Sequence, residues 1–167
     1  PVLQAALEGA TSLLLFPTKA LAHDQLRRLR AMAQVLGVEG VFPYDGDTPS
    51  ATRRQARERG LVLLSNPDML HYGLLPRHPD WAPFLARPRY VVLDELHAYR
   101  GVFGTHVALI LRRLLRLARH YGASPQVLAA SATIANAREH AEALTGLPFE
   151  ELKAQVARTE RELLVLL

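Results

Sequence analysis

Two adjacent carboxylates, Asp94 and Glu95, follow the apolar run at residues 90–93. Such a run is typical of a strand buried on both faces of a parallel sheet, and open α/β sheets bind ligands at the carboxyl ends of their strands. A carboxylate placed there can hold Mg²⁺, usually through water, while its neighbour orients or deprotonates a water that attacks a phosphoryl group. We therefore predict a magnesium ligand at Asp94 and a catalytic carboxylate at Glu95. The alternative is that both acids only cap a following helix.

The elements that must position these acids alternate along the chain, because short apolar runs are separated by segments of helical period. We expect strands at residues 12–16, 38–44, 61–64, 90–93 and 126–130. Helices are expected at residues 18–36, 49–59, 67–72, 102–121 and 135–145, and a loop with a short helix at residues 76–88. This alternation predicts the α/β fold class, with a mostly parallel sheet flanked by helices.

Composition limits the class of protein only broadly. A chain of 167 residues with 49% hydrophobic residues is long enough for one domain with a real core. The net charge of +4 suits a polyanionic partner but is weak support, and the arginines 112, 116 and 119 are expected to form a solvated helix face. The absence of cysteine excludes disulfides and cysteine-based zinc sites. The apolar runs are too short for a membrane span, so we expect no membrane partner and a cytoplasmic protein.

The segment DELH at residues 94–97 resembles motif II of the superfamily 2 DExH-type helicases. The longer string DELHAYRGVFGTH at residues 94–106 is similar to one subgroup, the mitomycin-repair-factor type with its RecQ-like relatives. Four further segments resemble helicase motifs and follow the family order: motif Ia (FPTKALAHDQ, 16–25), the GDT segment (YDGDTP, 44–49), motif Ib (SNPDML, 65–70) and motif III (SAT, 131–133). The resemblance extends over residues 12–145 and implies a RecA-like domain, with ATP and Mg²⁺ as cofactors.

The resemblance also implies that three residues assist the two acids. Ser131 and Thr133 follow a predicted buried strand whose end should lie beside Asp94, so their hydroxyls can bond the DExH segment and respond to nucleotide. Capping of the next helix is the alternative for both. His97 can link the ATP site to the nucleic-acid site, although a lone histidine can also be purely structural.

Three segments are implied to bind the nucleic-acid backbone. Thr18 and Asn66 stand directly before predicted helices, where an N-cap leaves backbone donors available for a phosphate. Each can equally be an ordinary helix start, and the turn at residues 45–48 suits any β-turn. The implied contacts are Pro17, Thr18, Lys19, Asp47, Thr48, Asn66, Pro67 and Asp68.

Two departures from the helicase pattern matter. The sequence contains no G-x-x-x-x-G-K-[ST] loop to cradle phosphates, and it lacks the motifs of a second RecA-like domain with its arginine finger. We therefore expect residues 1–146 to form a partial first RecA-like domain whose phosphate-loop strand is missing. Residues 147–167 are expected to be a charged linker and the start of a strand leading toward a second RecA-like domain.

These observations predict part of an ATP-dependent helicase or translocase that acts on nucleic acid, in particular single-stranded or tailed DNA, with a role in DNA repair. The isolated chain is expected to be inactive. The alternative is a non-catalytic module that binds nucleic acid or a protein partner. An unrelated α/β hydrolase that uses the acids with His97 would need a nucleophile motif such as G-x-S-x-G, which is absent.

Overall fold

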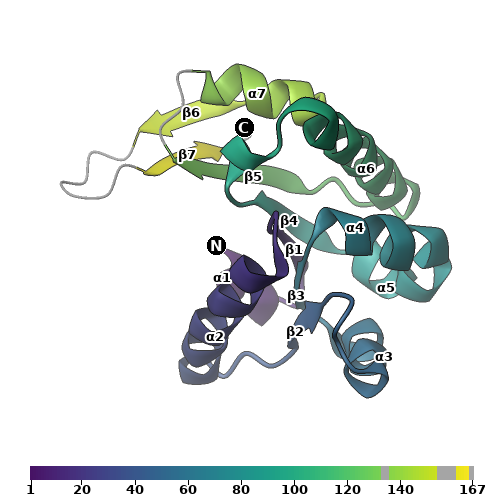
Figure 1. Cartoon of the computed structure of the whole chain (residues 1–167). Helices are drawn as coiled ribbons and strands as arrows, with labels where there is room; N and C mark the ends of the chain where they lie inside the picture. The colour runs from purple at the N-terminus through teal and green to yellow at the C-terminus, as the bar shows by residue number, and fades with distance from the viewer. Residues whose placement is uncertain (133–135, 154–160, 166–167) are drawn as a thin grey trace.

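The computed structural model describes residues 1–132, 136–153 and 161–165, which form a seven-stranded sheet flanked by helices (Figure 1). The strands follow the order β2-β3-β1-β4-β5-β7-β6. Five of them are parallel, namely β1 (Thr11–Leu15), β2 (Val41–Tyr44), β3 (Val62–Ser65), β4 (Pro88–Leu93) and β5 (Gln126–Ala132). The sheet ends in the antiparallel strands β7 (Arg161–Val165) and β6 (Glu150–Lys153). The predicted α/β class is confirmed.

Helices cover both faces of the parallel strands. In Figure 1, α1 (Val2–Leu7) and α2 (Lys19–Val35) lie on one side of the sheet, and α6 (Gly101–His120) and α7 (Ala137–Thr145) lie on the other. The remaining helical segments follow β2, β3 and β4: α3 (Ser50–Arg59), α4 (Pro67–Met69), the π-helix η1 (Leu70–Leu74), the 3₁₀ helices η2 (Leu75–Trp81) and η3 (Leu96–Ala98), and α5 (Ala82–Leu85). The parallel strands β2, β3 and β4 are therefore each followed by a turn or a helix.

The sheet separates two hydrophobic cores, because successive side chains of a strand point to opposite faces. In β3, Leu63 packs in the larger core with α6 and α7, whereas Val62 and Leu64 pack in the smaller core with α1 and α2. Every residue of β3 is buried, which explains why the parallel strands are apolar without alternation. Burial on both faces holds the strand ends, and the groups that follow them, in fixed positions.

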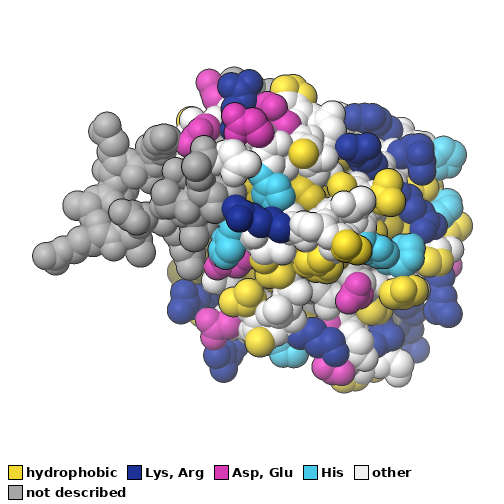
Figure 2. All heavy atoms as spheres, turned by 45° about the horizontal axis from the view of Figure 1, so that its top comes forward, with side chains coloured by type: hydrophobic (Ala, Val, Ile, Leu, Met, Phe, Trp, Pro, Cys, Tyr) yellow, Lys and Arg dark blue, Asp and Glu magenta, His cyan; other side chains and the backbone are white. Residues whose placement is uncertain are grey.

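Helix α6 is held close to the segment that follows the two acids. Its buried face has helical spacing and includes Val107, Ile110 and Leu114. Gly104 allows the first turn to approach the backbone of Tyr99, because a Cβ at this position would lie 2.8 Å from the Tyr99 carbonyl carbon. The opposite face carries basic side chains toward its C-terminal end, and Figure 2 shows them gathered at the right of the view. The arginines 112, 116 and 119 are exposed as expected.

Several predicted boundaries differ from the observed ones. The six-residue α1 was not predicted, because it has no side-chain cap and is short for a periodic pattern. The strand expected from residue 38 begins at Val41, since Gly40 before it has a φ of +88°. The helix expected at residues 67–72 continues as a π-helix to Leu74. The helix expected from residue 135 begins at Ala137, and residue 135 lies outside the described residues.

The C-terminal segment joins the same sheet. Strand β7 pairs with β5, and β6 pairs with β7. That residues 147–167 lead toward a second RecA-like domain stays a prediction. No helix in the described part of the chain is long and apolar enough to cross a membrane.

Candidate functional site

The two predicted acids lie at the end of β4, where the chain turns sharply. The Asp94 N–H donates to the Leu15 carbonyl of β1 over 3.0 Å, and one Asp94 carboxylate oxygen accepts from the Glu95 N–H at 3.0 Å. Glu95 has a φ of +51°, the only positive φ of a non-glycine residue among the described ones. A left-handed conformation costs such a residue on the order of 1–3 kcal/mol, and outliers of this kind cluster at functional sites. The tight turn directs both carboxylates to the carboxyl edge of the sheet.

The structure brings His97 and Ser131 to these acids. The His97 Nδ1 atom lies 3.3 Å from the Glu95 carboxylate and 3.4 Å from the Ser131 hydroxyl. Ser131 is buried near the end of β5, whereas the side chains of Glu95 and His97 are 26% and 39% exposed. The imidazole can therefore connect the carboxylate to the neighbouring strand. Thr133, predicted beside Ser131, lies outside the described residues.

Tyr99 is a site residue that sequence reasoning missed. Its hydroxyl donates to the Leu15 carbonyl at 3.3 Å, the same oxygen that accepts from the Asp94 N–H. The tyrosine is fully buried, and burial together with the negative charges of Asp94 and Glu95 raises the pKa of its hydroxyl. The hydroxyl stays protonated and can hold this bond over the whole physiological pH range. The only available signal was its place inside the DELHAYRG string.

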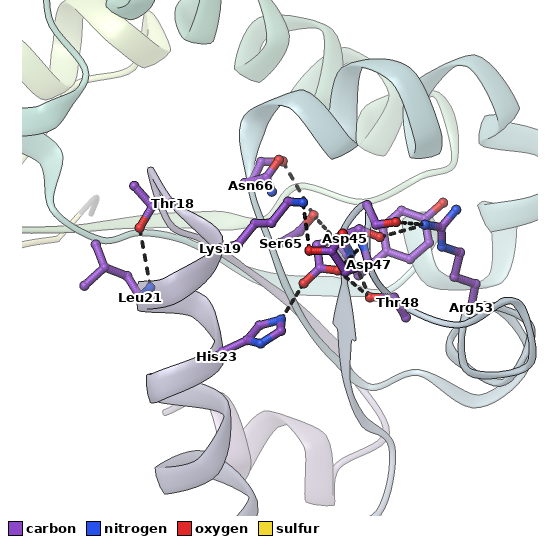
Figure 3. A network of polar contacts seen from close by, with 12 residues as sticks. Thr18, Lys19, Leu21, His23, Asp45, Asp47, Thr48, Arg53, Ser65 and Asn66 are labelled. Carbon is purple, nitrogen blue, oxygen red and sulfur yellow. Dashed lines mark hydrogen bonds and ion pairs between the residues drawn. The ribbon is translucent and has the colours of Figure 1, made fainter.

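A second group of polar side chains lies at the ends of β1 and β2. Figure 3 shows Lys19 and His23 of α2 pointing toward the turn at residues 45–48. The Lys19 ammonium lies 2.9 Å from the Asp47 carboxylate, and the His23 Nε2 atom lies 2.7 Å from the Asp45 carboxylate. Lys19 and Asp47 are largely exposed, with side-chain exposures of 47% and 71%, whereas the Asp45 side chain is 2% exposed. The exposed pair is therefore open to a ligand, and Asp45 is internal.

Asp45 organises the turn. Its carboxylate accepts from the Thr48 hydroxyl and from the Asp47 N–H, both at 2.9 Å. Burial by itself would raise the pKa of Asp45, but the hydrogen bonds from His23, Thr48 and the Asp47 backbone outweigh it, so the pKa is lowered from 3.8. Arg53 of α3 donates to the carbonyl oxygens of Asp45 and Gly46 at 2.9 and 2.8 Å. The result is a rigid turn that presents Asp47 outward.

The end of β3 completes this edge. The Ser65 hydroxyl donates to the Tyr44 carbonyl at 2.6 Å and so joins β3 to β2. Asn66 caps α4 by accepting from the Met69 N–H at 2.9 Å, and Thr18 caps α2 by accepting from the Leu21 N–H at 3.4 Å. The helix caps expected at both positions are confirmed. Their use by nucleic acid stays a prediction.

The predicted nucleic-acid residues fall into two groups by exposure. Thr18, Lys19, Asp47 and Asp68 are exposed, and Pro17 is half-buried. Thr48, Asn66 and Pro67 are buried, and the Thr48 hydroxyl and the Asn66 side-chain oxygen serve internal hydrogen bonds. Sequence reasoning also missed His23, Asp45, Arg53 and Ser65, although His23, Asp45 and Ser65 stand inside the motif Ia, GDT and motif Ib segments. The contact of His23 with Asp45 and that of Ser65 with Tyr44 join residues more than twenty positions apart in the chain.

The residues at the β4 end fit a magnesium ion only in part. No group of three or more histidine or acidic side chains suited to a metal occurs in the described part of the chain. Mg²⁺ normally keeps several waters and uses one or two carboxylates together with substrate phosphates. Asp94, which also lines a cavity of about 220 Å³ with Gln25 and Val92, is the kind of ligand that such an ion requires. The donor set suits an ion that arrives with a nucleotide.

Comparisons with known proteins agree with this arrangement. The family model for DEAD/DEAH box helicases matches residues 1–141. The chain is 48% identical to the uncharacterized ATP-dependent helicase YprA of Bacillus subtilis over 89% of its length, and 40% identical to the ATP-dependent helicase HRQ1 of Saccharomyces cerevisiae over 83%. These matches span 20% and 13% of the two relatives.

Solved structures give the same result. The crystal structure of the DUF1998 helicase MrfA bound to DNA and AMPPNP matches with a TM-score of 0.91 and 46% identity, covering 96% of this chain and 23% of that one. The fold and the acids at the strand end define an α/β domain of the RecA-like helicase type. The chain belongs to the DEAD/DEAH box helicase family, and its relatives include the YprA/MrfA-type and Hrq1 helicases.

The lowered pKa of Asp45 predicts a stability difference that depends on pH. A folded-state pKa below 3.8 means that the carboxylate stabilises the fold above that pH and that this contribution disappears as the pH falls through the lowered value. Asp45→Asn should therefore reduce the free energy of unfolding at pH 7 by about 1.5–3 kcal/mol, the range for hydrogen bonds to charged groups. Urea unfolding of both proteins between pH 7 and pH 3 measures this difference, which should shrink below about pH 3.9.

The exposed Asp47 supplies the control, since Asp47→Asn should change the free energy of unfolding by less than about 1 kcal/mol. A difference between wild type and Asp45→Asn that stays constant down to pH 3 would contradict the role of the Asp45 charge.

Proposed function

We propose that this chain forms the first motor domain of an ATP-dependent helicase or translocase that moves along DNA. The observation that carries the proposal is the shared hydrogen-bond acceptor at the end of β1. The Leu15 carbonyl accepts from the Asp94 N–H and from the Tyr99 hydroxyl, which belong with Glu95, His97 and Ser131 to the acid group at the end of β4. The chain continues from Leu15 directly into the segment with Thr18 and Lys19. A movement of Asp94 and Glu95 would thus move the backbone around Thr18, which would bind the nucleic acid.

Each member of the acid group has a role in phosphoryl transfer under this proposal. Asp94 would hold Mg²⁺, and the ion would neutralise charge on the phosphate oxygens. Glu95 orients the attacking water and accepts its proton. His97 contacts both Glu95 and Ser131, so a change at Glu95 when nucleotide binds would be transmitted to β5. Thr133 would act in the same way as Ser131.

ATP itself needs residues that this sequence does not contain. The 167 residues include no glycine-rich loop ending in Gly-Lys-Ser or Gly-Lys-Thr, so the phosphates would be cradled by residues outside this sequence. The chain spans about a fifth of the length of YprA and MrfA. Activity, substrates and partners are therefore proposed for the whole protein, with a second RecA-like domain that supplies the arginine finger.

The nucleic acid is proposed to bind along the ends of β1, β2 and β3. Lys19 offers a charge, and the exposed first turn of α2 offers backbone donors beside Thr18 and Pro17. The ends of β2 and β3 add Asp47, Thr48, Asn66, Pro67 and Asp68. Lys19 and the backbone N–H groups recognise phosphate and not sequence, whereas the carboxylates of Asp47 and Asp68 cannot pair with a phosphate. MrfA has been crystallised with DNA, which supports DNA as the ligand. The proposal adds that this DNA is single-stranded or tailed and that the protein acts in the cytoplasm.

The alternative is a module that binds nucleic acid or a protein without hydrolysing ATP. The absence of the phosphate-binding loop from these residues favours it for the chain taken alone. ATPase activity of the full-length protein separates the two proposals.

Glu95→Gln in the full-length protein should leave nucleotide binding intact and lower ATP turnover by about 10²-fold or more, because the amide can fill the space but cannot accept the proton. Steady-state ATPase assays with saturating single-stranded DNA, together with nucleotide titration, measure both effects. Glu58→Gln on the exposed surface of α3 is the matched control and should be silent. Normal turnover in Glu95→Gln would overturn the assignment.

Lys19→Ala should weaken binding of single-stranded DNA and reduce the slope of log affinity against log salt by about 1, because one phosphate contact is lost. Asp47→Asn should strengthen binding of single-stranded DNA, since it releases Lys19 from its ion pair. Fluorescence anisotropy at several salt concentrations measures both slopes. An unchanged slope in Lys19→Ala would exclude a phosphate contact at this lysine.

The isolated 167-residue chain should show no specific ATPase activity, although Asp94 and Glu95 are in place. The loop that holds the phosphates is not in this sequence, and in GTPases an arginine finger is by itself worth about 10³- to 10⁵-fold in rate. ATP hydrolysis by the purified chain, with Asp94→Ala as control, tests this. Turnover that disappears in the control would reveal a complete ATP site within these residues.

A further inference from the structure

An exposed aromatic cluster lies beyond the polar residues already described. The rings of His71 and Tyr72 meet edge to face at 4.6 Å, and His71 contacts the ring of His106 at 5.1 Å in the same manner. Tyr72 is 74% exposed. On α6, Val102 and Phe103 precede His106 by four and three residues, so they share its face, and they are 90% and 38% exposed. A tyrosine so open to water gains little from packing, so burial of the ring does not explain it.

The cluster lies at the carboxyl edge of the sheet. His71 and Tyr72 belong to η1, which follows the end of β3 through α4, and His106 lies in the second turn of α6, which follows the end of β4. The contact between His71 and His106 joins these two segments. Figure 1 shows α4 beside α6, and Figure 2 shows a hydrophobic band on this side of the molecule with histidine side chains beside it.

The distance from Tyr72 to the polar residues at the ends of β1 to β3 suits a single strand of nucleic acid. Tyr72 follows Asn66 by six residues, which corresponds to at most about 9 Å along a helix axis. That length corresponds to about three base steps at 3.4 Å per step. A strand whose phosphates lie against Thr18 and Lys19 and pass Asn66 would thus bring a base to the Tyr72 ring.

We propose that Tyr72, supported by His71 and His106, is a stacking platform for a base of the bound single strand. This inference rests on the proposed function, because it assigns a base contact to the same nucleic-acid surface. The ring presents an apolar π-face that any base can cover, so the platform adds affinity without sequence preference. His71 holds the tyrosine from one edge, which limits the freedom that Tyr72 loses when a base stacks on it.

The test compares two ligands that differ only in their bases. Oligodeoxythymidylate and an abasic strand of equal length, each with a fluorescent end label, are titrated with the full-length protein. Tyr72→Ala should weaken binding of oligodeoxythymidylate about 5- to 150-fold and leave binding of the abasic strand unchanged. Tyr72→Phe, which keeps the ring, should restore wild-type affinity.

The salt dependence separates this contact from phosphate binding. Tyr72→Ala should keep the wild-type slope of log affinity against log salt, since stacking releases no counterions. Val35→Ala, 87% exposed at the far end of α2, is the matched control for loss of a surface apolar side chain. Because Tyr72 is exposed, thermal unfolding of Tyr72→Ala should match that of wild type.

Equal losses on both strands, or no loss on either, would overturn the stacking platform while the proposed nucleic-acid function stands. Failure of the wild-type protein to bind either strand would overturn the proposed function, and the platform with it. A Tyr72→Phe variant as weak as Tyr72→Ala would show that the hydroxyl and not the ring is used, which also contradicts stacking.

Discussion

The carbonyl oxygen of Leu15 is the point on which the rest of the site depends. It ends β1, accepts from the backbone of Asp94 at the end of β4, and accepts from the buried hydroxyl of Tyr99. Parallel pairing of β1 with β4 places these groups side by side, since Leu15 is in register with Leu93. The first residues after the two strands must therefore lie side by side, with the Thr18 segment after β1 and the acids after β4. Few other arrangements satisfy the same buried backbone groups.

Because of this constraint, the carboxyl edge of the sheet has two parts that differ in how far their polar groups are exposed. Around Glu95 the groups are partly buried and held by a strained left-handed turn, which suits chemistry that excludes water. Around Lys19 the charged atoms are exposed, while the buried Asp45 only fixes the turn that carries Asp47. Rigid internal hydrogen bonds beneath exposed charges are what a backbone-binding surface needs, because the ligand then orders few protein groups when it binds.

Much of the fold could be predicted because burial on both faces produces continuous apolar runs. The strand of Leu63 and the amphipathic period of α6 are visible without any tertiary information. The short α1 and the π-helix from Leu70 were missed for the opposite reason, as both depend on packing and not on local preference. The capping roles of Thr18 and Asn66 were predictable, since a cap bonds within its own turn.

The sequence by itself determined the α/β class, the family resemblance, the positions of Asp94 and Glu95 at a strand end, and the helix starts, because each depends on residues near one another in the chain. Only the tertiary structure decided which polar groups meet across long separations. His23 bonds Asp45, 22 residues away, and Tyr99 bonds Leu15, 84 residues away. The His71 ring likewise meets that of His106 from another helix. Such pairs are set by strand order and register, which no local pattern of residue types encodes.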